Sequence, residues 1–365
     1  MNLSALELKP DLADSLQRFE AWWVNETLDR PPVTVRVQPV RPYDGPIREH
    51  ASHRDRWLDA EYQVDRAIAE VLRYEYPADS VPYVRPGVGP ELSSTPLGAE
   101  LEFGETTSWS KPWVASAEQW SDVATRRPDF HNPYWQKIEE MTRLILDKCN
   151  HRFAVGVADL HGNYDLLAGL RDPELLCMDL IDRPELVDAA AKRASSVFVQ
   201  CFQRHEGMIR DGGAIPTSFI TALHDGPTYL ASCDFWCMLG PDHARRFVLP
   251  RIVEETRPLE RCIFHLDGPQ ALRHLDLILG LDELHAVQWV YGAGNGPASR
   301  WIEVYRRIRN AGKAIQVLAQ TPRDALDVLD AVGTRGLWLD IAAPFDDATA
   351  ARAFASATRR SSRRC

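Results

Sequence analysis

Short apolar runs rich in β-branched residues alternate with segments of helical pattern along the whole chain. Most of these runs are near-continuous in apolar residues, which is typical of parallel strands covered by helices on both faces. Eight runs repeat in this way, at 32–39, 79–86, 152–160, 218–225, 262–268, 286–292, 314–320 and 336–342. The pattern predicts an α/β protein built as a single (β/α)8 TIM barrel.

The segments between the runs carry helix signals, such as the Asn132-Pro133 start of an apolar helical stripe. The first half of the chain is less regular than the second. An N-terminal extension precedes the first run, and 86–135, with Pro, Gly and several Trp, forms a long insertion after the second strand. Because no low-complexity linker interrupts the pattern, we expect one barrel domain over 1–358 and a basic, disordered tail over 359–365.

The formal net charge of the 365-residue chain is −10, which argues against a nucleic-acid-binding protein, since such a protein needs a basic face. A small anionic substrate is still allowed, because a few arginines can dominate locally. No apolar run approaches the roughly 18 residues of a membrane span. The acidic start is unlike a signal peptide. The seven cysteines are scattered and form no C-x-x-C pair, so we expect reduced thiols and a cytoplasmic protein.

Polar side chains gather at the carboxyl ends of the predicted strands, where the active sites of such barrels lie. His, Asp and Tyr groups that converge there are suited to acid–base catalysis or metal binding. The expected catalytic residues on this basis are His161, Tyr164, His265 and Asp267. The expected substrate-binding residues are Arg85, Asp159, His224, Gln288 and Trp289, and Gln320 and Asp340 end the last two strands.

His265 and Asp267 form the sharpest of these groups, because two residues apart on a strand they point to the same face. Such a pair could hold a divalent metal such as zinc or share a proton. The alternative is that Asp267 only fixes a structural histidine. The sequence offers no evident third ligand, and His161 or His224 would serve only if the barrel brought one of them close.

Two loops carry weaker signals. The stretch 159–164 has the polar density of a site, but His161 could equally be a surface-loop histidine with satisfied hydrogen bonds. The glycine-rich stretch 291–297 could cradle an anion with backbone N–H groups. It lacks the spacing of a dinucleotide-binding fingerprint, and a β–α turn needs glycine in any case.

The sequence resembles the uroporphyrinogen decarboxylase superfamily, which also contains corrinoid and coenzyme M methyltransferases. The similarity runs from about Phe19 to Ala355 and implies the barrel fold, an enzyme, and by analogy a homodimer. The stretches that carry it are WWVNETLDRPPV, DSVPYVRPGVGPELSSTPLGAEL, VGVADLHGNYDLLAGLRDPELLCMDLIDRPELV, SCDFWCMLGPDHARRFVLPRI, FHLDG and AVQWVYGAG. Together they look most like a decarboxylase-like branch distinct from the haem-pathway enzyme.

The departures from the family pattern bear on the reaction. The arginine-rich R-Q-A-G-R-Y segment of the haem-pathway decarboxylases is missing, so uroporphyrinogen is not expected as the substrate. The resemblance matches the decarboxylases' catalytic aspartate to Asp79 and their active-site tyrosine to Tyr164. Where they have D-S-W, this chain has Asp234-Phe235-Trp236. The methyltransferases' His-x-Cys zinc motif corresponds to His265-x-Asp267, which would suit a metal with harder ligands.

Three functions follow as hypotheses. The first is metal-assisted methyl transfer or lyase chemistry on a small polar or anionic substrate, with His265 and Asp267 as ligands and, in the family-typical version, a corrinoid partner. His161 or Tyr164 would then move protons. The second is a metal-free decarboxylase that uses Asp79, His161 and Tyr164, with His265 as another proton donor. The third is a ligand-binding barrel without catalysis.

Overall fold

The structure is a computed structural model that describes residues 5–359. Two parallel sheets form its centre. One has six strands in the order β1-β11-β10-β9-β8-β7, and the other has three in the order β2-β5-β6. Their bounds are β1 Val33–Val37, β2 Tyr83–Val84, β5 Ala154–Gly156, β6 Pro216–Thr217, β7 Thr228–Ser232, β8 Arg261–Asp267, β9 Ala286–Val290, β10 Ala314–Ala319 and β11 Leu337–Phe345.

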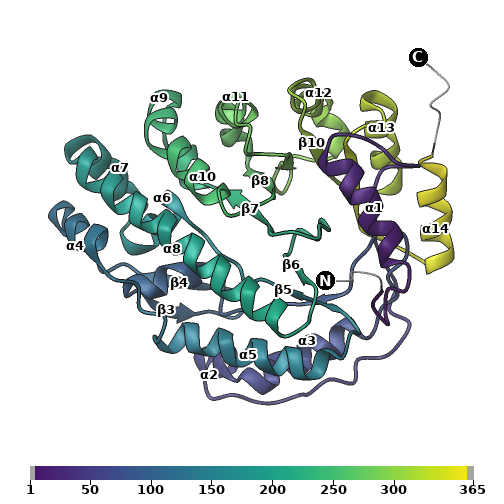
Figure 1. The fold of residues 1–365 in the computed structure, drawn as a ribbon, viewed down its shortest axis with the longest axis horizontal. Helices are drawn as coiled ribbons and strands as arrows, with labels where there is room; N and C mark the ends of the chain where they lie inside the picture. The colour runs from purple at the N-terminus through teal and green to yellow at the C-terminus, as the bar shows by residue number, and fades with distance from the viewer. Residues whose placement is uncertain (1–4, 360–365) are drawn as a thin grey trace.

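Helices follow the strands and pack outside them, so that the strands lie within a crescent of helices (Figure 1). This arrangement confirms the predicted barrel-type α/β fold. The α-helices are α1 Leu12–Trp23, α2 His53–Leu58, α3 Ala60–Val71, α4 Trp120–Thr125, α5 Pro133–Cys149, α6 Asn163–Leu170, α7 Pro173–Asp182, α8 Pro184–Asp211, α9 Pro241–His243, α10 Leu249–Thr256, α11 Leu275–Leu279, α12 Ile302–Asn310, α13 Pro322–Val332 and α14 Ala348–Ala357. The 3₁₀-helical segments are η1 Pro90–Leu97, η2 Ala117–Gln119, η3 Phe235–Met238, η5 Pro269–His274 and η6 Ala298–Trp301, and η4 Ala244–Val248 is a π-helical turn.

Local sequence explains where several helices begin. Asn132 caps α5 as its pattern predicts, because its side chain accepts the backbone N–H groups of Tyr134 and Trp135. The sequence carries one long helical apolar pattern over 47–76, but the structure divides this region into α2 and α3. Asp59 causes the break, since its side chain accepts the N–H of Tyr62 and starts a second helix.

The predicted long insertion after the second strand contains a two-stranded antiparallel hairpin and short helices. The hairpin pairs β3 (Glu100–Phe103) with β4 (Ser108–Lys111). The predicted tail lies outside the described residues except for Arg359, whose guanidinium donates to Asp29. Within residues 5–359, no helix is long and apolar enough to cross a membrane.

The fourth strand is not where the sequence predicts it. Instead of one strand over 218–225, the chain forms β6, turns back, and forms β7 after Gly226-Pro227. Ser218 stabilises the turn, because its hydroxyl bonds the backbone of Ile220. The apolar run between β6 and β7 therefore returns the chain to the amino end of the strands, where the Trp23 indole donates to the Leu223 carbonyl.

The N-terminal helix α1 covers the amino ends of the strands. Its buried aromatic residues reach into the barrel, where the Trp22 indole donates to the carbonyl of Ile315 at the start of β10. Phe19 packs edge-on against Trp338 with ring centroids 5.0 Å apart. This aromatic base closes one end of the strands and leaves the carboxyl end for a site.

Candidate active site

Charged side chains converge at the carboxyl ends of β2, β5, β7 and β8, which we call the mouth. Arg85 follows β2, and its Nη1 atom lies 3.3 Å from an oxygen of Asp159, which follows β5. The ring of Phe219 connects these residues to β8. The Arg85 guanidinium lies 5.5 Å from the ring centroid, and the imidazole of His265 packs edge-on against the same ring at 6.0 Å. Arg85, Asp159 and His265 thus face one shared space.

His161 is one of the mouth residues whose pKa departs from its ordinary value. Burial alone would lower the pKa of its imidazole. The nearby carboxylates of Asp159, Asp165, Glu91 and Asp234 outweigh burial and raise that pKa above its ordinary value. The His161 backbone N–H donates to the Ser93 hydroxyl at 2.9 Å, which holds the loop in place. His161 is therefore poised to carry a proton.

Asp234 is the main residue that the sequence analysis left without a role. It lies two residues after the end of β7, beyond Cys233, and its side chain is exposed. Partial desolvation and the negative charge of Asp165 raise its pKa to about 6, although His265 and His161 act in the opposite direction. Both histidines therefore lie within electrostatic reach of one carboxyl group.

The backbone of the Asp234 turn is held by a single carboxylate. Asp165 accepts the N–H groups of Asp234 at 3.0 Å and of Phe235 at 2.8 Å. The sequence contains the signal for this site, a polar residue just after a strand. A predicted fourth strand over 218–225 hides this signal, because the strand that precedes Asp234 is β7 at Thr228–Ser232.

His265 and Asp267 point to the same face of β8, and His265 Nε2 lies 4.0 Å from an oxygen of Asp267. The other ring nitrogen, Nδ1, bonds the side-chain oxygen of Gln288. One nitrogen of His265 is thus engaged within the barrel, and the other faces the mouth.

These donors do not fit the expected zinc site. Across residues 5–359, no three His, Cys, Asp or Glu side chains are grouped so that they could hold a metal ion. A protein zinc site needs at least three such ligands at about 2.0–2.3 Å from the ion. His265 and Asp267 supply two, and we assign no chemical step to a metal.

Asp79 does not lie at the mouth. Its backbone N–H donates to the carbonyl of Val33 at 2.9 Å, which places it at the amino end of β1. The side chain is fully buried and bonds Arg30, Arg18 and the Val33 N–H. These contacts make Asp79 the centre of an ion-pair network beneath the barrel, out of reach of a substrate at the opposite end.

Tyr164 also points away from the mouth. Its ring is fully buried and stacks on Phe235 with centroids 6.0 Å apart. Burial raises the pKa of its hydroxyl far above the ordinary value, with a further contribution from Asp188 on α8. The side chain lies in the helical layer, where it contributes packing.

Three of the five expected substrate-binding residues have other contacts. His224 lies at the amino end of the strands between Glu20, at 2.7 Å, and Glu260, at 3.3 Å. Trp289 points outward and packs against Trp301, with ring centroids 5.2 Å apart. Gln288 faces inward, because neighbouring residues on a strand alternate, but both ends of its amide are bonded within the barrel. Arg85 and Asp159 lie at the mouth.

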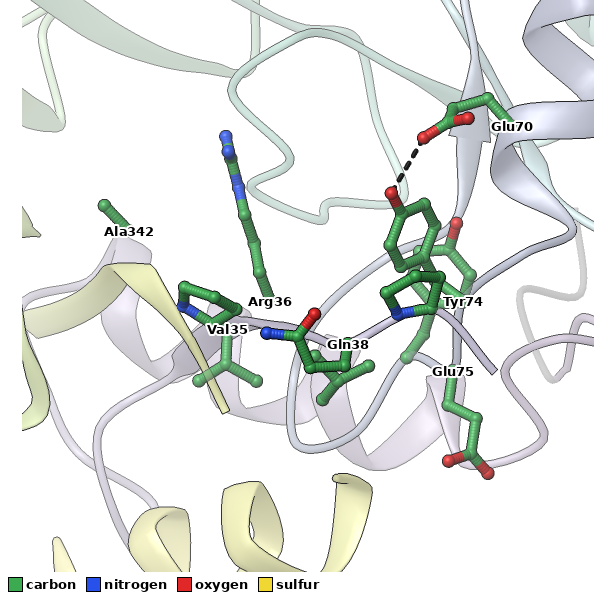
Figure 2. A pocket seen from close by; sticks show the side chains of 11 residues that line it. Val35, Arg36, Gln38, Glu70, Tyr74, Glu75 and Ala342 are labelled. Atoms are coloured by element: carbon green, nitrogen blue, oxygen red, sulfur yellow. Dashed lines mark hydrogen bonds between the residues drawn. The ribbon is translucent and has the colours of Figure 1, made fainter. Parts of the chain in front are cut away.

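Cavities continue from the mouth towards β1. One of about 390 Å³ is lined by the carboxyl ends of β9, β10 and β11 together with Arg36. A second, of about 500 Å³, shares Arg36 and has walls from Gln38, Tyr74 and Tyr76 (Figure 2). A third, of about 510 Å³, shares both tyrosines and reaches Arg85. The second cavity shares lining residues with each of the other two.

Arg36 stands out in this region. Its side chain extends away from Tyr74 and Glu75 in Figure 2, and it makes no hydrogen bond or ion pair with another residue of 5–359. Burial raises the pKa of Asp340 above its ordinary value, and the charge of Arg36 is one of the effects that act in the opposite direction. An unpaired guanidinium beside an open cavity is suited to bind an anionic group.

No protein-family model matches the chain, and no curated protein matches it either. Among solved structures, a methyltransferase from Methanosarcina mazei matches with a TM-score of 0.58 at 13% sequence identity, over 94% of this chain and 98% of that one. A B12-independent methionine synthase from Shewanella sp. W3-18-1, in complex with selenomethionine, matches with a TM-score of only 0.36 at 10% identity, over 72% and 73% of the two chains. The second likeness is too low to support an argument. The first shows that this chain has the fold of that methyltransferase.

Proposed function

We propose that this chain is an enzyme that transfers a methyl group between small molecules by paired acid and base catalysis at the mouth. The observation that carries the proposal is the contrast between two histidines beside one carboxyl group. Carboxylates favour the protonated form of His161, whereas His265 presents Nε2 to the mouth. A protonated histidine and a second histidine with a ring nitrogen facing the same space are suited to act as acid and base.

Each histidine would handle one proton of the transfer. His265 Nε2 takes the proton of a thiol or hydroxyl acceptor as its sulfur or oxygen bonds the methyl carbon. The bond between that carbon and the donor atom breaks, and His161 protonates the leaving atom. Asp234, beside both histidines, would stabilise the charge on each of them in turn. The name of the fold neighbour, a methyltransferase, favours this reaction class.

The acceptor would be a thiol or hydroxyl rather than a corrinoid. A reduced corrinoid carries no proton to remove, so a reaction with it would not need His265 as a general base. A corrinoid-bearing partner protein stays the family-typical alternative. The two acceptors differ in their need for a base, which an acceptor screen distinguishes.

The substrate would be anionic, with Arg36 as its anchor. Arg85 is already paired with Asp159, whereas the Arg36 guanidinium has no such partner among the described residues. The cavity beside it combines an apolar and aromatic lining, from Val35, Tyr74 and neighbouring residues, with the carboxylates of Glu70, which pairs with Arg73, and Glu75. A substrate with one carboxylate and an apolar body would match both the charge of Arg36 and the apolar part of the cavity lining.

Decarboxylation is the second candidate, favoured by the near-neutral pKa of Asp234. A carboxyl of this kind can protonate the carbanion left when carbon dioxide departs. Of the residues proposed for this reaction from the sequence, His161 and His265 lie at the mouth, whereas Asp79 and Tyr164 do not. A non-catalytic barrel is the third candidate, and it predicts that changes at the mouth leave ligand binding intact.

The test is a screen of methyl donors bearing a carboxylate, with small thiols as acceptors, read by mass spectrometry of both products. Carbon dioxide release is measured in parallel. We expect His265→Ala to lower the turnover of a hit by about 10²-fold or more, the usual size of a lost general base. The matched control is His53→Ala, at an exposed histidine of α2. Equal losses in both variants, or none in either, would reject the assignment of His265.

A further inference from the structure

A chain of side-chain hydrogen bonds crosses four neighbouring strands behind His265. His265, Gln288 and Gln316 stand directly opposite one another on β8, β9 and β10. His265 Nδ1 bonds the Gln288 oxygen, and Gln288 Nε2 donates to the Gln316 oxygen at 2.8 Å. Gln316 Nε2 then donates to Asp340 of β11 at 3.0 Å. Gln288 and Gln316 are almost fully buried, so water does not compete for these bonds.

The far end of the chain fixes the direction of every bond in it. A carboxylate can only accept, so Asp340 must receive an N–H from Gln316. This turns the Gln316 oxygen towards Gln288, which must donate to it. The Gln288 oxygen then faces His265. Reversing either amide would bring two oxygens together.

The acceptor role of Asp340 is supported from the other side. The Trp338 indole donates to the Thr34 hydroxyl oxygen at 2.9 Å. The Thr34 hydroxyl hydrogen is then available for Asp340, to which Thr34 forms a side-chain hydrogen bond. Burial raises the pKa of Asp340, whereas the hydrogen bonds from Thr34 and Gln316 and the charge of Arg36 favour its ionised form. The chain therefore ends on a carboxylate held by two donors and one cation.

We infer that Asp340, Gln316 and Gln288 are positioning residues that hold the neutral His265 with its proton on Nδ1 and its lone pair on Nε2, facing the mouth. Only the use of that lone pair as a base rests on the proposed function. The tautomer itself follows from the hydrogen bonds. An imidazole free of such contacts prefers the other tautomer, so the chain acts against the intrinsic preference of the ring.

The test is nitrogen NMR of protein labelled with ¹⁵N in its histidine side chains, under conditions in which His265 is neutral. Its signals are assigned by their loss in His265→Ala. In the parent protein we expect Nδ1 to show the shift of a protonated nitrogen and Nε2 that of an unprotonated one. Gln316→Met breaks the chain and should move His265 towards the Nε2-protonated form. Asp340→Asn, which can donate as well as accept, should give a mixture.

The matched control is Gln320→Met, the same substitution just beyond β10 at an exposed glutamine without a side-chain hydrogen bond among the described residues. It should leave the His265 signals unchanged. Circular dichroism checks that each variant folds, and Asp340→Asn serves if Gln316→Met does not. The inference is overturned by a protonated Nε2 in the parent, or by folded variants that keep the parental tautomer. A correct tautomer without methyl transfer would reject the proposed function alone.

Discussion

Charged side chains are paired differently at the two ends of the strands. At the amino end, Asp79 is fully buried and balanced by Arg18 and Arg30. At the carboxyl end, Asp234 and His161 lie among further carboxylates, and Asp234 has its pKa raised in part by a like charge. Opposite charges brought together stabilise a fold, whereas like charges held together cost stability. The second arrangement is therefore the one that indicates function.

Replacing Asp79 with Asn should give the largest loss of stability, because it removes the charge balance at the amino end of the strands. The change leaves two arginines without their shared carboxylate, and loss of one partner of a buried ion pair costs about 3–5 kcal/mol. Urea unfolding would measure the loss. Asp29→Asn is the control, because Asp29 also pairs with Arg18 but is about one-third exposed, and exposed pairs contribute only about 0–1 kcal/mol. Similar small losses in both variants would show that the Asp79 network is not the stabilising element.

A buried carboxyl group below the loop of His161 should make stability depend on pH. Glu255 is almost fully buried, and burial raises its pKa to about 8 from an ordinary 4.5, against hydrogen bonds from Asn163 and Ser195. Its folded form holds a proton that the unfolded chain releases above pH 4.5. The stability it contributes is thus complete below pH 4.5 and is lost as the pH rises towards 8.

Unfolding free energies at several pH values between 5 and 8 test this assignment. The parent should lose stability over that range, and Glu255→Gln, which cannot ionise, should lose less. Glu254→Gln, at the neighbouring and more exposed carboxylate, should follow the parent. Parallel curves for all three proteins would show that Glu255 does not titrate in this window.

Replacing Asp234 with Asn, at the mouth, should lower activity without lowering stability. Removing one of several like charges should leave the free energy of unfolding unchanged or slightly raised. The turnover of a substrate found by the screen should fall by about 10²-fold if Asp234 supports proton transfer. Asp242→Asn, on the exposed start of α9, is the matched control for both measurements. A destabilised Asp234→Asn with full activity would reverse our interpretation of this end.

The fold was accessible from the sequence because strands and helices follow the apolar pattern locally. The prediction of a strand over 218–225 is wrong, although the run is apolar enough for one. The run ends at Gly226-Pro227, and the strands β6 and β7 lie on either side of it. Sequence could place Gln288 and Trp289 near a strand end. It could not decide which of them faces inward, because that depends on the phase of the strand against its neighbours.

The candidate site was less accessible, since it depends on contacts between distant segments. Asp79 matched a family pattern, yet its pairing with Arg18 and Arg30 at the amino end follows only from how α1 packs. The chain from His265 to Asp340 joins residues on four strands, and each link depends on strand register. No local pattern marks such a set.

The smallest effect is expected from zinc. With two donors, His265 and Asp267, whose nearest atoms are 4.0 Å apart, the mouth should retain no stoichiometric ion after gel filtration, and added zinc should leave the melting temperature unchanged. Elemental analysis of the parent, His265→Ala and Asp267→Ala measures retention. About one zinc per parent chain, lost in both variants, would mean that a third ligand moves into place on binding. The like-charged carboxylates of the mouth would then be held together by a cation, and the contrast between the two ends of the strands would disappear.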